Sequence, residues 1–161
     1  MNPSVCRETL DKLFAEEAGA LARLEEILDR EHEFLVANDV DEFERTGEAR
    51  QACVANLVRI EDERRSLCRM MNVSADPLGL EKLIAWCDPA RSLKKRVDAC
   101  TERAGRCRSL NDRNGALVNA RLKNVEGLLG VITGRANQPK TYGRQGTYQN
   151  LTPASRLNTS V

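Results

Sequence analysis

The stretch Leu10–Leu35, LDKLFAEEAGALARLEEILDREHEFL, decides the fold of this chain. Its apolar residues recur at alternating steps of four and three, which is the spacing of a heptad helix. The seam consists of Leu10, Phe14, Glu17, Leu21, Leu24, Leu28, Glu31 and Leu35. Neighbouring apolar residues make the stripe wider than a two-stranded coiled coil requires, so we expect this helix to contact two others in a bundle. Glu17 and Glu31 interrupt the seam, and there we expect thinner packing.

A second helix is predicted directly after the first. Asp39, followed three residues later by Glu42, has the pattern of a capping box and predicts a helix start. Three-and-four spacing then continues to about Asn72. Its seam is Phe43, Thr46, Arg50, Cys53, Leu57, Ile60, Arg64, Leu67 and Met71. Because the connection is short, the two helices should form an antiparallel hairpin.

Two further helices follow. Asp76-Pro77 supplies an N-cap with proline at the first helical position, which predicts a short helix to about Asp88. We expect its Trp86 to pack as an anchor in the core. Pro89 should open the last helix, which keeps the heptad spacing for about 40 residues and ends at Gly134 as a C-terminal cap.

These patterns predict an all-α fold. We expect an elongated antiparallel helical bundle, with coiled-coil packing, of three long helices and one short one. The predicted domains are a helical bundle over residues 1–134 and a flexible basic tail over 135–161. The tail has no acidic residue and is rich in Gly, Pro, Asn, Gln, Ser and Thr, so we expect it to be disordered when unbound.

Composition narrows the classes of function. A chain of 161 residues has no room for two full enzyme domains, and its 4% of aromatic and 30% of charged residues suit long solvated helices. No apolar stretch reaches a membrane span, and the first residues do not resemble a secretion signal, so we expect a cytoplasmic protein without membrane insertion. The six cysteines form no C-x-x-C pair and His32 is the single histidine, so we predict no metal site or cofactor. Cys100 and Cys107 lie one heptad apart on the inner face of the last helix, where we expect them to fill the core as thiols.

Charge is distributed unevenly along the chain. Residues 8–48 hold 14 acids against 4 bases, and residues 89–113 hold 8 bases against 3 acids. We interpret this as an acidic early helix that lies beside a basic late helix. Binding of DNA or RNA by the basic helix and tail is the weaker alternative, and we predict no nucleic-acid partner.

The sequence does not contain a combination of residues that predicts a catalytic site. Catalysis by side chains needs a nucleophile with a base or paired carboxylates in a cleft, and phosphate binding needs a glycine-rich loop; none occurs at usable spacing. Gly143 and Gly146 lack the strand-turn-helix context of a dinucleotide site.

The last part of the final helix is more apolar than the rest of that helix. These residues are Leu117, Val118, Leu122, Val125, Leu128, Leu129 and Ile132. Two interpretations remain open: the stripe completes the bundle, or it is exposed and binds a partner. In the tail, Tyr142 lies among glycines and polar residues, as in a short docking motif whose aromatic anchor supplies much of the affinity.

Two short motifs carry a resemblance to a known family. Leu110-Asn111-Asp112-Arg113-Asn114-Gly115 lies in the last long helix, and Tyr142-Gly143-Arg144-Gln145-Gly146 lies in the tail. Together with the helical layout and the apolar stretch between them, they resemble the FlgN-type flagellar export chaperones over nearly the whole chain. The motif residues that carry the resemblance are Leu110, Asn111, Asn114 and Gly115 in the helix and Tyr142, Gly143 and Gly146 in the tail.

The resemblance implies a non-enzymatic chaperone. Such a protein holds hook-filament junction proteins, also called hook-associated proteins, unassembled in the cytoplasm and delivers them to the flagellar type III export gate. It implies that cargo binds the stretch from Leu117 to Ile132, and that Tyr142, with Gly143 and Gly146, docks at the gate protein. The alternative is a coiled-coil adaptor that self-associates without a secretion cargo, and a homodimer is left open.

Overall fold

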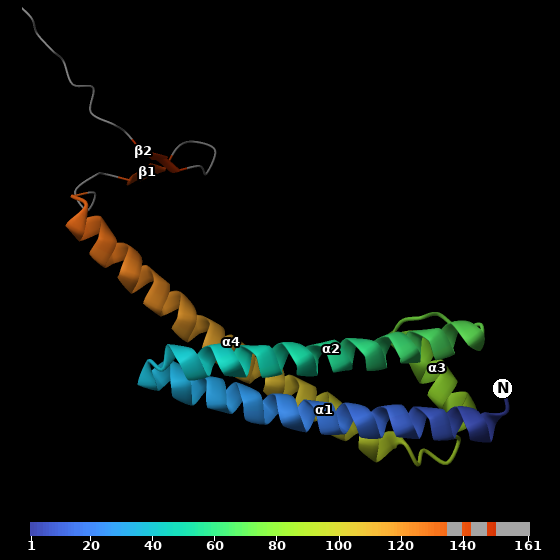
Figure 1. Cartoon of the computed structure of the whole chain (residues 1–161). Coiled ribbons are helices and arrows are strands. Elements are labelled where there is room, and N and C mark those ends of the chain that lie inside the picture. The colour runs from blue at the N-terminus through green and yellow to red at the C-terminus, as the bar shows by residue number, and fades with distance from the viewer. Residues whose placement is uncertain (135–139, 143–147, 151–161) are drawn as a thin grey trace, which may run out of the picture. The chain divides into compact units, whose positions relative to one another are not determined.

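Four helices form this protein in a computed structural model that describes residues 1–134, 140–142 and 148–150. The helices are α1 (Pro3–Ala37), α2 (Val40–Met70), α3 (Pro77–Cys87) and α4 (Lys94–Ile132). Figure 1 labels the four helices and colours them from the N-terminus to the C-terminus. The prediction of an all-α fold is confirmed. In the part of the chain that the structure describes, no helix is long and apolar enough to cross a membrane.

Local capping explains where the helices begin. Asn2 caps α1 by accepting a hydrogen bond from the Ser4 backbone N–H at 2.8 Å. Asp39 and Asp76 cap α2 and α3 in the same way, as the sequence predicted. Asn38, in the left-handed conformation with φ 59°, ends α1 and allows the chain to reverse.

The start of α4 differs from the prediction. The helix begins at Lys94 rather than at Pro89. The buried Asp88 accepts hydrogen bonds from the Leu93 backbone N–H (2.7 Å) and the Ser92 hydroxyl (2.6 Å). These hydrogen bonds stabilise the turn that precedes the helix. At the other end, Gly134 has φ +69°, which fits the predicted C-terminal cap.

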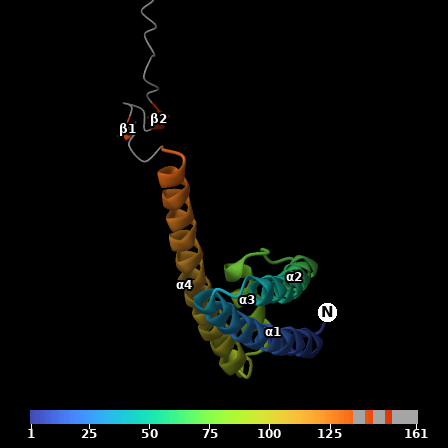
Figure 2. The same ribbon diagram turned by 60° about the vertical axis from the view of Figure 1, so that its left-hand side comes forward.

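The helices α1 and α2 form the predicted antiparallel hairpin. Both views show them side by side (Figures 1 and 2), and their core is an apolar cluster of Leu13, Ala20, Ile27, Cys53 and Ile60. Glu17 pairs with Arg64, and Glu31 pairs with Arg50. The residue numbers rise along α1 while they fall along α2, which shows that the two helices are antiparallel.

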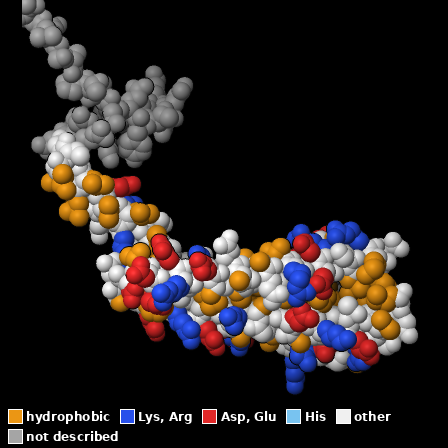
Figure 3. Space-filling view, in the orientation of Figure 1, with side chains coloured by type: hydrophobic (Ala, Val, Ile, Leu, Met, Phe, Trp, Pro, Cys, Tyr) orange, Lys and Arg blue, Asp and Glu red, His pale blue; other side chains and the backbone are white. Residues whose placement is uncertain are grey.

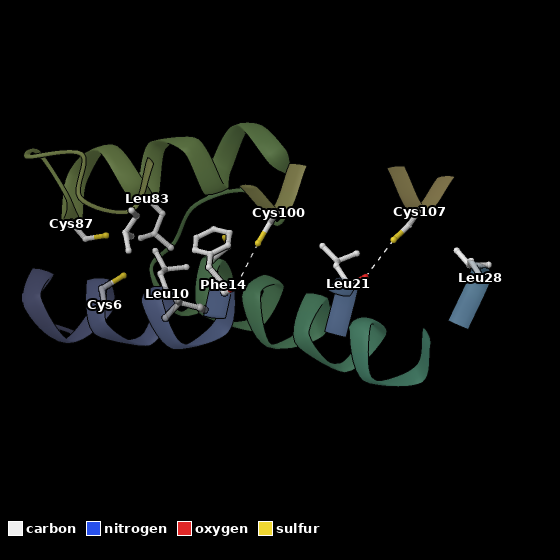
Figure 4. Packing of buried hydrophobic residues seen from close by; sticks show 12 residues of the cluster. Cys6, Leu10, Phe14, Leu21, Leu28, Leu83, Cys87, Cys100 and Cys107 are labelled. Atoms are coloured by element: carbon white, nitrogen blue, oxygen red, sulfur yellow. Dashed lines mark hydrogen bonds between the residues drawn. The ribbon is translucent and has the colours of Figure 1, made fainter. Parts of the chain in front are cut away.

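The short helix α3 packs on the end of this hairpin where α1 begins. Leu83 and Cys87 of α3 face Cys6, Leu10 and Phe14 of α1 (Figure 4). The prediction that Trp86 anchors the core is wrong, because 46% of its surface is exposed. An α-helix of 11 residues can bury only one side, and Leu83 and Cys87 occupy that side.

The described part of the tail contains secondary structure that the sequence analysis did not anticipate. Strands β1 (Lys140–Tyr142) and β2 (Tyr148–Asn150) pair antiparallel, with Tyr142 opposite Tyr148. Threonine and tyrosine favour strands, which accounts for the position of the pairing.

The chain divides into two compact units, Met1–Val118 and Asn119–Val161. This division falls inside α4, whereas the domain boundary after residue 134 stays a prediction.

Candidate partner-binding site

The first part of α4 is held on α1 by a ladder of side chains. Cys100 Sγ lies 3.4 Å from the Phe14 carbonyl oxygen, and Cys107 Sγ lies 3.5 Å from that of Leu21 (Figure 4). One heptad further, Asn114 Nδ2 donates to the Leu28 carbonyl oxygen at 2.7 Å. Because the numbers rise by seven on both helices, α1 and α4 run parallel with their heptads in register.

A buried polar cluster ends this ladder. Glu31 and Asn114 are 2% and 4% exposed, and Asn114 Nδ2 lies 3.5 Å from Glu31 Oε2. Arg50 Nε of α2 lies 2.9 Å from Glu31 Oε1 as an ion pair, without hydrogen-bond geometry. The prediction of thin packing at Glu31 is therefore wrong, because a carboxylate can be buried where an arginine and an amide surround it.

The prediction of thin packing is also wrong at Glu17. Arg64 Nη1 lies 2.6 Å from Glu17 Oε2, and both side chains are mostly buried. Arg64 also lies over the Phe14 ring, 5.6 Å from its centroid. The acidic seam positions thus join α1 to α2 instead of loosening the bundle.

Acidic α1 and basic α4 are paired by exposed salt bridges, as the charge pattern indicated. The pairs are Arg96–Asp11 (2.6 Å), Arg106–Glu25 (2.9 Å) and Arg113–Asp29 (3.1 Å). Exposed pairs contribute about 0–1 kcal/mol each, so they specify the pairing of the two helices more than they stabilise the fold.

Beyond Val118, the apolar residues of α4 are exposed. Leu122, Val125, Leu128, Leu129 and Ile132 are between 52% and 78% exposed. Figure 3 shows their hydrophobic side chains gathered along the last turns of the helix. The steps from 122 to 125, 129 and 132 are three, four and three residues, so these side chains form one apolar face.

The ends of the predicted stripe differ from its centre. Leu117 and Val118 are only half-buried and belong to the first compact unit. Val131, which sequence reasoning missed, is 69% exposed beside Ile132. The hydrophobicity of Val131 was visible in the sequence, but sequence reasoning did not include it in the apolar stretch.

Comparison with known proteins identifies this arrangement. The family model of the FlgN protein matches residues 1–150. This chain belongs to the FlgN family. The crystal structure of a flagella synthesis protein FlgN from Pseudomonas aeruginosa is 30% identical, with a TM-score of 0.61 over 69% of this chain and 87% of that one. No curated protein matches the chain. Membership makes it a flagellum-associated protein of a non-enzymatic family.

The helical motif of this FlgN-family protein has an inner and an outer side. Asn114 is buried in the polar cluster, and Leu110 is half-buried against the core. Asn111, three residues before Asn114, is exposed. Gly115 is exposed, and a Cβ atom added there would meet no atom within 4 Å. The two side chains are about 60° apart around the helix, and the hydrogen bond to the Leu28 carbonyl oxygen shows that Asn114 is the one that faces α1.

The tail motif is only partly described. Tyr142 ends strand β1, whereas Gly143 and Gly146 lie outside the described residues. In the described part of the chain, no three or more His, Cys, Asp or Glu residues gather as metal ligands. The roles of the tail residues stay predictions.

The six cysteines of this FlgN-family protein are free, buried thiols, which confirms the prediction made for Cys100 and Cys107. Burial, followed by the neighbouring Cys6, raises the pKa of the Cys87 thiol to about 12. Burial also raises the pKa of the other five thiols. These protonated thiols act as small apolar side chains and weak donors, as in the ladder.

Alkaline pH should therefore destabilise the fold. A thiol in the unfolded chain has a pKa of about 8.5, so the unfolded state loses its protons first as pH rises. The stabilising contribution of Cys87 is complete below that pH and is lost as pH rises toward 12. We expect the urea-derived free energy of unfolding to fall over this range, with a shallower fall in Cys87→Ala. An equal slope in the variant would contradict this assignment.

Proposed function

We propose that this FlgN-family protein is a cytoplasmic chaperone that binds hook-filament junction proteins and delivers them to the flagellar type III export gate. The observation that carries the proposal is the exposed apolar face of α4 from Leu122 to Ile132. A monomeric protein rarely exposes a contiguous apolar face without using it to bind a partner. Membership of a flagellar family supports the choice of cargo.

The spacing of this face fits a helical segment of the cargo. Leu122, Val125 and Leu129 recur at steps of three and four, so a second amphipathic helix can lie along them. Fully burying a leucine or valine side chain contributes about 1.5–3 kcal/mol. Several such anchors give tight but reversible capture, because ordering the cargo segment costs part of that free energy. Leu117 and Val118 would continue the cargo-binding face at lower exposure.

Calorimetric titration with a hook-filament junction protein from the same bacterium tests this function. We expect a one-to-one complex with the full-length protein. A wild-type protein that takes up no junction protein would overturn the proposal and leave the self-associating adaptor as the alternative.

The adaptor receives less support from the contacts of α1 and α4. An adaptor that associates through its heptads needs those seams free, yet Cys100, Cys107 and Asn114 are engaged with α1 of the same chain. Sedimentation velocity measures whether the free protein is a monomer or a homodimer.

The tail would act at the later, delivery step. We propose that Tyr142, together with Gly143 and Gly146, docks at the export gate protein. Changing Tyr142 to alanine should then reduce export of the junction proteins at least tenfold in cells, since an aromatic anchor supplies much of the affinity of a short motif.

Cargo binding provides the control for this prediction. The calorimetric affinity of Tyr142→Ala for the junction protein should equal that of the wild type, because Tyr142 lies outside the apolar face of α4. Unchanged export in the variant, or a loss of cargo affinity, would contradict a gate-docking role.

A further inference from the structure

A groove of about 550 Å³ lies over α1, between α2 and α4, within the first compact unit. Leu24 of α1 lies at its floor, beside the more deeply buried Leu21 and Leu28. Gly47 and Val54 form the wall from α2, and Ala104 contributes to the wall from α4. Val54 is 43% exposed, and Val58, one helical turn further along α2, is 55% exposed. The residues that line the groove are all different from those of the exposed apolar face at the end of α4.

Both walls have the spacing that receives a helix. On α2 the positions 47, 51, 54 and 58 step by four, three and four, and on α4 the positions 104, 108, 111 and 115 do the same. Because α2 and α4 run in opposite directions, Gly47 and Gly115 lie at the same end of this pattern. Each of these glycines would accept a Cβ atom with no neighbour within 4 Å. Small residues on α2 and α4 leave room for the side chains of another helix to interdigitate with those of both walls. The groove is the place where a fourth helix would complete a four-helix bundle.

The groove also gives the helical motif a second role. Asn111 and Asn114 are three residues apart, and only Asn114 binds α1. Asn111 is exposed and lines the groove. Its amide can donate to and accept from a partner, as can that of Gln51 on the opposite wall.

The charge of the lining selects the partner. Its ionic side chains are Arg50 and Arg108, with no carboxylate among the lining residues. Arg50 stays 42% exposed despite its ion pair with Glu31, and the described residues offer Arg108 no salt-bridge partner. The tail of this chain has no acidic residue after Glu126, so charge disfavours it as the occupant.

We infer that this groove binds one amphipathic helix of a protein partner, with apolar residues at heptad spacing and Asp or Glu beside them. The site goes beyond the proposed capture of cargo by the end of α4 and does not require it. Leucine or valine side chains of the partner would contact Leu24 and Val54, and its carboxylates would pair with Arg50 and Arg108.

Two synthetic helical peptides test the inference against the full-length protein. Both carry leucine at the heptad seam positions over two heptads; one has glutamate at the flanking positions and the other lysine. By fluorescence anisotropy at low salt, we expect the glutamate peptide to bind at least tenfold more tightly. Equal affinities, or no binding of the glutamate peptide, would overturn the inference.

Variants locate the binding site. Gly47→Leu should fill the groove and weaken the binding of the glutamate peptide at least tenfold. The variant should still fold, because a Cβ atom at position 47 meets no other atom within 4 Å. Gly19→Leu is the matched control, since Gly19 is an exposed helical glycine with equal room and lies outside the groove lining. Binding that survives Gly47→Leu would overturn the inference.

Two more variants separate this site from the cargo site. Arg108→Glu should remove the preference for the glutamate peptide, and Leu122→Asp with Leu129→Asp should leave the peptide affinity unchanged. If only the Leu122 and Leu129 variant loses peptide binding, the peptide binds the end of α4. That result would overturn the inference that the groove is the binding site. Failure of the cargo titration with intact peptide binding would refute the proposed function alone.

Discussion

Replacing Leu122 and Leu129 together by aspartate is expected to weaken the binding of a hook-filament junction protein by about 100-fold or more. Each leucine contributes about 1.5 kcal/mol or more when a partner buries it, and each new carboxylate would have to be desolvated at the interface. Two such losses correspond to at least two factors of ten in the dissociation constant. Calorimetric titration measures this constant for the wild type and the variant.

Stability separates a lost contact from a lost fold. Both leucines are more than half exposed, so the free energy of unfolding should change by no more than about 0.5 kcal/mol. Leu78→Asp is the matched control, because Leu78 is 58% exposed on α3 and is not one of the residues of the proposed cargo face. Wild-type affinity in the double variant would refute the placement of cargo on α4.

Replacing Asn114 by aspartate is expected to lower the free energy of unfolding by about 3 kcal/mol or more. The change keeps the size of the side chain but removes the amide donor that binds the Leu28 carbonyl oxygen at 2.7 Å. It also sets a second carboxylate beside buried Glu31, whose Oε2 lies 3.5 Å from Asn114 Nδ2. An uncompensated buried charge costs about 3–5 kcal/mol. Urea denaturation followed by circular dichroism measures the loss.

Asn111→Asp provides the same chemical change at an exposed position three residues earlier. Its unfolding free energy should stay within about 0.5 kcal/mol of the wild type, because water solvates the new charge. Similar stabilities for the two variants would show that the polar cluster does not hold α4 on α1.

Prediction from the sequence succeeded where a short stretch of chain contains its own cause. The caps at Asp39 and Asp76 act on backbone N–H groups three residues away, so the starts of α2 and α3 could be predicted locally. The heptad spacing of Cys53, Ile60 and Leu67 likewise identified a buried face of α2. The apolar character of the end of α4 was also visible in the sequence, but the sequence did not show whether these residues are exposed.

Prediction failed where a residue's surroundings come from distant parts of the chain. Glu31 was predicted to mark thin packing because neither Arg50 nor Asn114 is near it in sequence. Trp86 was predicted to be a packing anchor, yet Leu83 and Cys87 occupy the inner side of α3 and Trp86 is 46% exposed. The groove was missed because Gly47 and Ala104 are informative only once α2 and α4 lie on either side of α1.

The sequence by itself determined four helices, the caps at Asp39, Asp76 and Gly134, the pairing of acidic α1 with basic α4, and the apolar character of the last helical turns. These properties follow from spacing, capping and charge, which act over a few residues or along one helix face. The tertiary structure alone decided that α1 and α4 align through Cys100, Cys107 and Asn114, that Glu31 is buried, and that Leu122 to Ile132 are exposed. Burial depends on which helices meet, and hydrophobicity is the same for a residue in a core and on a binding face.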